Sequence, residues 1–170
     1  MNYTIRIVAI VFFISLFGIS STSAQGSLGK GNEQFNGGVG FSTWGVPIYL
    51  GMDFGVHQDV TIGPVVSYRN YSERFNSVKY SHSIFTLGFN GNYHFNTLID
   101  LDPEWDLYAG LTLGYYIWSS PNDYGGAQAS SLGLQGQIGG RYFFSDKFGV
   151  NIEFGGGLAS GGRFGVTVKL

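Results

Sequence analysis

From residue 34 onward the chain alternates between apolar residues and small or polar residues, and this period of two constrains the fold more than any other feature. In the clearest copy the alternate positions are Leu107, Ala109, Leu111, Leu113, Tyr115 and Ile117. Because successive side chains of a strand point to opposite faces, this segment has one apolar face and one small or polar face. Copies at 48–57, 85–95, 148–155 and 164–170, with weaker ones near 34–44, 60–71 and 131–143, predict eight strands.

The first 24 residues are expected to be a cleavable signal peptide rather than part of the fold. Arg6 is their only charge, residues 7–19 are an almost unbroken apolar run, and residues 20–24 are small, as a signal peptidase requires. The run is too short for a comfortable transmembrane helix, although an uncleaved anchor is the alternative. We expect cleavage after Ala24, a flexible N-terminal tail at 25–33 and a single domain at 34–170.

Composition excludes several classes of function. The chain has no Cys, which excludes a disulfide framework and a thiol nucleophile, and its net charge of −2 argues against a nucleic-acid partner. His57, His82 and His94 lie in different segments without ligand-like spacing, so we expect no metal. The glycine-rich stretches lack the strand–loop–helix context of a phosphate cradle, so we expect no cofactor.

The apolar face of the eight segments carries almost no charge, and this decides which face is the outside. A soluble barrel such as a lipocalin, the alternative reading of the alternation, needs Lys and Glu on its outer face. Aromatic residues also gather near the strand ends, among them Trp44, Tyr68, Trp105, Trp118 and Tyr142, as in the two girdles of a membrane barrel. The sequence therefore predicts an all-β fold, an eight-stranded antiparallel up-and-down transmembrane β-barrel.

The connections predict which end of this barrel is which. Residues 57–59 and 145–147 are tight turns, and 96–104 is somewhat longer. The polar stretches 71–83 and 119–130 are expected to be long loops at the other end. Short turns on the periplasmic side and longer loops outside are typical of outer-membrane barrels.

The C-terminal segment 163–170 places Gly165, Val168 and Leu170 in a pattern that resembles the insertion signal read by the outer-membrane assembly machinery, with Leu170 where Phe is usual. The whole chain after residue 24 resembles the small porin-like outer-membrane barrels of Gram-negative bacteria, of the OmpX and OmpA transmembrane-domain type. Residues 139–149 are similar to a turn common in the Bacteroidota branch. The resemblance implies a location in the cell outer membrane, contact with its lipid and lipopolysaccharide, and insertion by the assembly machinery. We expect a monomer.

Charged residues on the inward face must pair, because an eight-stranded barrel is only wide enough for its own side chains. The inward charged and titratable residues are expected to be Asp53, His57, Arg69, His94, Asp106, Arg141, Glu153, Arg163 and Lys169. Counting from the 145–147 turn sets Glu153 one diagonal step from Arg141 and opposite Arg163. We therefore predict an Arg141–Glu153–Arg163 cluster that plugs the lumen, with an ion pathway as the alternative.

The function expected from these patterns is structural or surface interaction rather than catalysis. The loop residues, an aromatic and polar mixture, suit surface contacts but also fit plain solvated loops. A narrow pore and a lipid A-modifying enzyme are the alternatives. Ser81, His82 and Ser83 with Glu73 supply the residue types of nucleophilic catalysis, but adjacent strand residues point to opposite faces, and lipid A deacylases have one residue between His and Ser. We therefore expect no catalytic residue.

Overall fold

Eight strands and one short helix make up the structure, a computed structural model that describes residues 27–126, 129–157 and 159–170. The elements are β1 (Glu33–Ser42), β2 (Ile48–His57), β3 (Val60–Phe75), β4 (Val78–His94), α2 (Asn96–Ile99), β5 (Trp105–Ser119), β6 (Ser131–Phe143), β7 (Phe148–Gly157) and β8 (Gly161–Lys169). The expected signal peptide lies outside the described residues. Within the described ranges, no helix has the length and apolar character needed to cross a membrane.

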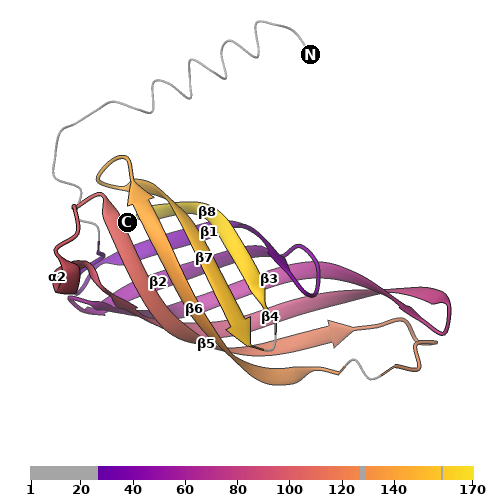
Figure 1. Ribbon diagram of the computed structural model, residues 1–170. Helices are drawn as coiled ribbons and strands as arrows, with labels where there is room; N and C mark the ends of the chain where they lie inside the picture. Colours follow the sequence, from indigo (N-terminus) through magenta and orange to yellow (C-terminus); the bar gives the residue numbers. More distant parts are fainter. Residues whose placement is uncertain (1–26, 127–128, 158) are drawn as a thin grey trace, which may run out of the picture.

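The strands close into one barrel in sequence order (Figure 1). Each strand is antiparallel to the next, and β1 pairs with β8 in a register that sets Phe35 opposite Val168. Closure pairs both edges of the sheet in the body of the barrel, while β3 beyond Tyr68 and β4 before Ser83 pair only with each other. The up-and-down antiparallel barrel predicted from the alternation is therefore confirmed.

The two ends of the barrel differ in construction. The turn end carries α2, the β2–β3 and β6–β7 turns and residue 170, whose amide N–H donates to the Glu33 carbonyl at 3.0 Å. The hairpin end carries the β3–β4 hairpin and the β5–β6 connection, which extend well past the body of the barrel (Figure 1).

The stretch 71–83, expected to be a loop, is mostly strand. β3 and β4 continue in register to Phe75 and Val78, and only Asn76 and Ser77 turn the chain, with φ values of 48° and 67°. Two consecutive residues at positive φ make the tight turn that suits the twist of a hairpin. The loop prediction was wrong here because strands that project beyond the apolar belt need no apolar face, so their polar composition resembles that of a loop.

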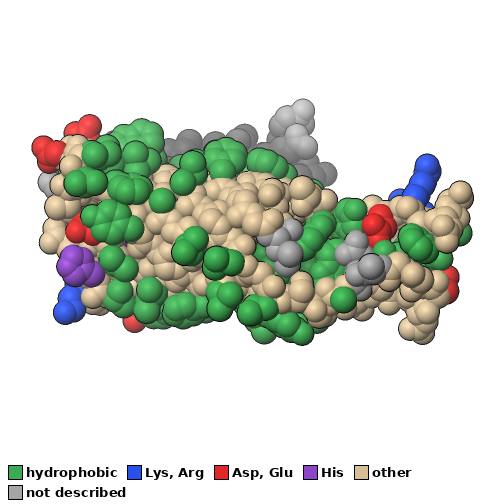
Figure 2. Space-filling view, turned by 60° about the horizontal axis from the view of Figure 1, so that its bottom comes forward, with side chains coloured by type: hydrophobic (Ala, Val, Ile, Leu, Met, Phe, Trp, Pro, Cys, Tyr) green, Lys and Arg blue, Asp and Glu red, His purple; other side chains and the backbone are tan. Residues whose placement is uncertain are grey.

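Burial is inverted relative to a water-soluble domain. The buried residues are mainly polar, and on the inward face they include Gln34, Asn36, Asp53, Thr61, Asn90, Asn92, His94, Asp106, Gln137, Arg141, Asn151, Glu153 and Thr167. Large apolar side chains cover the outside, with Leu111 56% exposed and Ile138 63% exposed. Figure 2 shows apolar side chains over the flank of the barrel, while the visible charged side chains gather at its two ends. This is the surface pattern of a barrel surrounded by hydrocarbon.

The described part of the expected N-terminal tail is held against the barrel. Leu28 is 3% exposed, the Gly31 amide donates to the Gly55 carbonyl at 2.8 Å, and the Gly55 amide donates to the Asn32 carbonyl at 3.0 Å. A Cβ at residue 55 would collide with the Gly29 carbonyl oxygen, so glycine is needed where this segment passes β2. The expectation of flexibility is therefore wrong for residues 27–33.

The outward position of Leu111 gives a direct test of the environment. Leu111→Arg should lower the free energy of unfolding in lipid vesicles by about 2–4 kcal/mol, the usual cost of an arginine near the middle of a bilayer on a barrel's lipid face. Urea titration followed by tryptophan fluorescence measures it. Leu98→Arg, on exposed helix α2, is the control and should have little effect. Equal midpoints for the two variants would mean that residue 111 faces water.

Candidate functional site

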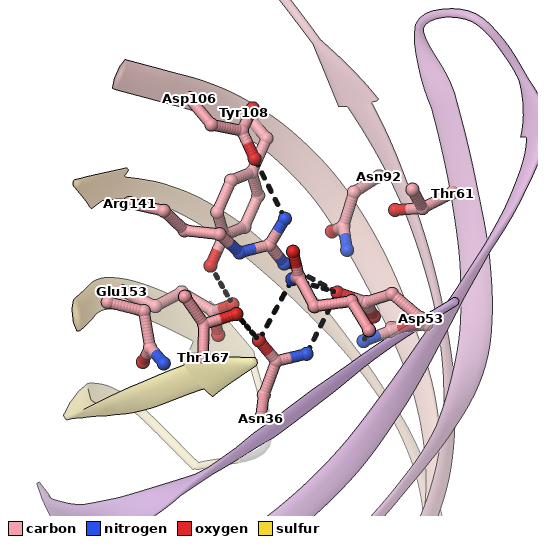
Figure 3. Close-up of polar contacts among 12 residues, drawn as sticks. Asn36, Asp53, Thr61, Asn92, Asp106, Tyr108, Arg141, Glu153 and Thr167 are labelled. Atoms are coloured by element: carbon pink, nitrogen blue, oxygen red, sulfur yellow. Dashed lines mark hydrogen bonds and ion pairs between the residues drawn. The ribbon is translucent and has the colours of Figure 1, made fainter. Parts of the chain in front are cut away.

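Arg141 is the centre of an ionic network inside the barrel. Its guanidinium is buried and donates from Nη2 to Asp53 Oδ2 at 2.5 Å and from Nη1 to Asp106 Oδ2 at 2.9 Å (Figure 3). Asp106 lies directly opposite Arg141 in the β5–β6 register, whereas Asp53 reaches it across the lumen from β2. The network therefore ties non-neighbouring strands together by charge.

His94 extends the network toward β3. Its Nδ1 lies 2.6 Å from Asp106 Oδ1, and its Nε2 lies 2.9 Å from Thr61 Oγ1. The three side chains come from β4, β5 and β3, and each is almost fully buried. The contacts run unbroken from Thr61 through His94, Asp106 and Arg141 to Asp53, so bonded polar side chains fill this cross-section of the lumen.

Amide side chains complete the coordination of Asp53. Asn36 Nδ2 donates to Asp53 Oδ2 at 2.9 Å, and Asn90 Nδ2 donates to Oδ1 at 3.5 Å. Thr167 on β8 in turn donates to Asn36 Oδ1 at 2.7 Å. These bonds carry the network around to the strands that close the barrel.

Glu153 forms a second ionic group. Arg163 Nη2 donates to Glu153 Oε2 at 2.8 Å, and the Tyr108 hydroxyl donates to the same oxygen at 3.0 Å. The Tyr108 ring also lies under the Arg141 guanidinium, 4.4 Å from its Cζ, and so links the two groups. A Cβ at residue 139 would overlap this ring, so Gly139 makes room for it.

The predicted Arg141–Glu153–Arg163 cluster needs a correction. Glu153 and Arg163 are opposite in the β7–β8 register and form an ion pair, but Arg141 pairs with Asp53 and Asp106 instead. Register counting along neighbouring strands finds Glu153 and Arg163, whereas a partner that reaches across the lumen from β2 leaves no signal in local spacing. The pairing of Arg141 with Asp106 could have been predicted, because the two residues are opposite each other in the β5–β6 register.

His57 and Lys169 were also predicted to point into the lumen, and the prediction is wrong for His57. The side chain of His57, expected inside, is 69% exposed at the end of β2. Lys169 lies with its Nζ 4.0 Å from the centre of the Phe143 ring. Within the C-terminal pattern, Gly165 and Val168 lie on β8, and Leu170 follows it with 64% exposure.

At the hairpin end, His82 lies beside Ser120 and Glu73, which are distant from it in sequence. His82 is 1% exposed, its Nδ1 lies 2.8 Å from Ser120 Oγ, and its Nε2 lies 3.4 Å from Glu73 Oε1. Sequence reasoning considered Ser81 and Ser83, but Ser83 donates to Asn70 Oδ1 instead. Ser120 was missed because it follows His82 by 38 residues.

Aromatic rings enclose His82. The Tyr71 ring stacks on it at 6.2 Å, and the Trp118 and Tyr124 rings meet it edge-on at 5.8 and 4.6 Å. The Tyr124 hydroxyl donates to Glu73, and this bond raises the pKa of Tyr124 to about 12. The carboxylate beside His82 is therefore positioned from the β5–β6 connection. Across the described ranges no group of three His, Asp or Glu side chains could hold a metal ion.

Removing Arg141 tests the ionic network. Arg141→Leu leaves Asp53 and Asp106 without their shared cation in a confined space, and breaking a buried pair in this way costs about 3–5 kcal/mol. We expect the urea midpoint in lipid to fall accordingly, whereas Asn122→Ala, on an exposed loop, should leave it unchanged. A wild-type midpoint for Arg141→Leu would show that water already screens these carboxylates.

No protein-family model and no curated protein sequence matches the chain. Solved structures do match. Neisserial surface protein A aligns with a TM-score of 0.57 at 15% identity, over 82% of this chain and 95% of that structure. The N-terminal β-barrel domain of Pseudomonas aeruginosa OprF aligns with a TM-score of 0.53 at 16% identity, over 84% of this chain and 99% of that domain.

A barrel from the de novo design of transmembrane β-barrels also aligns, with a TM-score of 0.54 at 15% identity over 85% of this chain and 99% of the design. At these identities the likeness is one of fold. The chain has the eight-stranded antiparallel fold shared with outer-membrane β-barrels, as its residue pattern predicted.

Proposed function

We propose that the protein is an integral outer-membrane barrel that is exported by a signal peptide cleaved after Ala24 and acts at the cell surface. The apolar flank, the polar interior and the likeness of fold support this location. The turn end then faces the periplasm and the hairpin end faces outward, because short turns are periplasmic in such barrels. Pairing of β1 with β8 removes the free edges through which strands associate in the body of the barrel, which supports a monomer.

The C-terminal residues Gly165, Val168 and Leu170 fit a role in insertion by the assembly machinery. Gly165 and Val168 belong to β8, the strand that closes the barrel against β1, and Leu170, whose side chain is exposed, directly follows β8. A recognition segment in β8 would stay accessible to the assembly machinery until β8 pairs with β1 and the barrel closes.

The packed interior supports a surface role over a pore. The ionic groups around Arg141 and Glu153 cross the lumen, and the rings of Tyr49, Tyr108 and Tyr116 are buried inside the barrel. An eight-stranded barrel leaves no aqueous channel once such side chains occupy it.

Two cations on the β3–β4 hairpin, which no acidic residue of the described chain neutralises, give the strongest support for a surface role. Arg74 and Lys79 are exposed and directly opposite each other, next to the turn. Like charges at opposed positions repel, and neither residue has a carboxylate within 4 Å in the described ranges, where all the acidic residues of the chain lie. An anionic partner would relieve this repulsion.

The tip of the hairpin is held by aromatic contacts on both sides of its turn, so the two cations are presented on a firm support. The Tyr124 ring lies 5.6 Å from the Phe75 ring and 5.1 Å from the Tyr80 ring, which joins the hairpin to the β5–β6 connection. At the outer face, phosphate groups of lipopolysaccharide are the anions within reach. We propose that Arg74 and Lys79 bind them.

The hairpin cations can be removed without touching the barrel. Arg74→Ala with Lys79→Ala, in lipopolysaccharide-free nanodiscs, should weaken binding of soluble phosphorylated lipopolysaccharide roughly thirtyfold, at about 1 kcal/mol for each cation near an anionic surface. Thermophoresis measures this, and Lys147→Ala at the other end is the control. Equal binding of dephosphorylated lipopolysaccharide by the wild type would contradict phosphate recognition.

A second candidate function, acyl-ester hydrolysis, is favoured by the contacts of His82. A hydroxyl, an imidazole and a carboxylate in line are the groups that activate a serine nucleophile, and Ser120, His82 and Glu73 supply them at the outer rim. In this reaction Ser120 Oγ attacks the ester carbonyl while His82 accepts its proton and passes it to the departing alcohol. Water activated by His82 then hydrolyses the acyl-enzyme to release the fatty acid.

Fatty-acid release from lipid A or a phospholipid ester tests this candidate by mass spectrometry. Turnover should be lost in Ser120→Ala and retained in Ser83→Ala, whose hydroxyl is adjacent to His82 in sequence but bonded to Asn70. Absence of turnover by the wild-type protein, or turnover that survives Ser120→Ala, removes the candidate and leaves the hairpin proposal untouched.

A further inference from the structure

Arg69 is a buried cation whose contacts are all neutral. It lies on β3 and is 7% exposed. Its Nη1 donates to Ser42 Oγ at 3.0 Å and its Nη2 to Ser67 Oγ at 3.1 Å, while its Nε has no acceptor in the described part of the chain. The other guanidinium groups inside the barrel differ, because buried Arg141 has two carboxylates and partly buried Arg163 has one.

No carboxylate of this chain is placed to neutralise Arg69. The residues outside the described ranges include no Asp or Glu, and none of the ion pairs in the described ranges involves Arg69. Glu153 lines the same cavity but is already bound by Arg163 and Tyr108. A buried charge without a counter-charge is strongly disfavoured, so the missing charge points to a ligand.

Arg69 lines a cavity of about 80 Å³ inside the hairpin half of the barrel. Its polar lining includes Ser42, Ser67, Thr86 and Gln135, and the Thr86 hydroxyl has no hydrogen-bond partner among the described residues. The charged groups on the lining are Arg69, Arg163 and Glu153, which sum to one positive charge. The volume suits one small ion with one or two waters, since each water in the liquid occupies about 30 Å³.

Aromatic side chains at the hairpin end shield this cavity. Tyr116, which lines it, packs against Trp44 at a ring distance of 5.6 Å, and Trp44 meets Trp118 at 5.0 Å. Ile84 and Ala159 are buried in the same cluster. Burial of Arg69 strengthens the attraction between its guanidinium and an anion, because the local dielectric constant is low.

We propose that the Arg69 cavity binds one small monovalent anion of the size of chloride. The guanidinium supplies the charge. The Ser67 and Thr86 hydroxyls are free to donate, whereas Ser42 already donates its hydrogen to the Gly45 carbonyl at 2.9 Å. One negative charge makes the lining neutral, so a monovalent ion matches the site better than a divalent oxyanion.

Chloride dependence of stability tests the proposal. Wild-type protein in nanodiscs is titrated with urea in sodium gluconate, whose anion is too large for the cavity, and in chloride at equal ionic strength. The midpoint should rise with chloride and saturate as for one site. Arg69→Gln should abolish the shift, and Lys147→Gln, an exposed cation at the turn end, should retain it. A wild-type midpoint that ignores chloride, or an equal shift in Arg69→Gln, overturns the proposal.

A direct measurement covers the case in which Arg69→Gln does not fold. Crystals of the wild-type protein soaked in bromide should show an anomalous peak within hydrogen-bonding distance of the Arg69 guanidinium and the Thr86 hydroxyl. No peak at Arg69 in bromide-soaked crystals, with peaks elsewhere on the molecule, overturns the assignment.

Discussion

Pairing of β1 with β8 is the constraint on which the rest of the structure depends. A sheet in hydrocarbon must satisfy every backbone N–H and C=O internally, and only a closed ring of strands does so. With β1 and β8 joined over residues 34–42 and 161–169, each strand has two partners. Closure also assigns every residue to the inside or the outside, so a period of two becomes an apolar outer wall and a polar core.

Because the lumen is narrow, the charged residues that the alternation places inside must be neutralised there. Arg141 is acceptable inside because Asp53 and Asp106 share its charge, and Glu153 because Arg163 and Tyr108 bind it. Applied to the three arginines inside the described barrel, the same rule singles out Arg69, which has only hydroxyl partners. The closed lumen and the anion site thus follow from one principle, that charge inside a low-dielectric core must be neutralised.

The two ends of the barrel are built for different tasks. At the turn end, residues 27–33 pack against β2, the β2–β3 and β6–β7 turns are short, and the β4–β5 connection carries helix α2. At the hairpin end, β3 and β4 run past the barrel, and the Tyr124 ring packs against His82 and Tyr80 of β4. Arg74, Lys79 and the Ser120–His82–Glu73 group are all at this end, and both proposed functions are therefore assigned to it.

The alternation by itself determined the strand number, the antiparallel up-and-down order and which face is apolar, because strand geometry converts a period of two directly into opposite faces. Register counting along adjacent strands also placed Glu153 opposite Arg163. Only the tertiary structure decided that Arg141 pairs with Asp53, that Ser120 and not Ser83 meets His82, and that residues 71–83 form a hairpin. The first two contacts join residues far apart in sequence, through the curvature of the closed barrel and the course of a loop, and no local spacing records either. The hairpin was missed because its strands lie beyond the apolar belt, where no alternation is required.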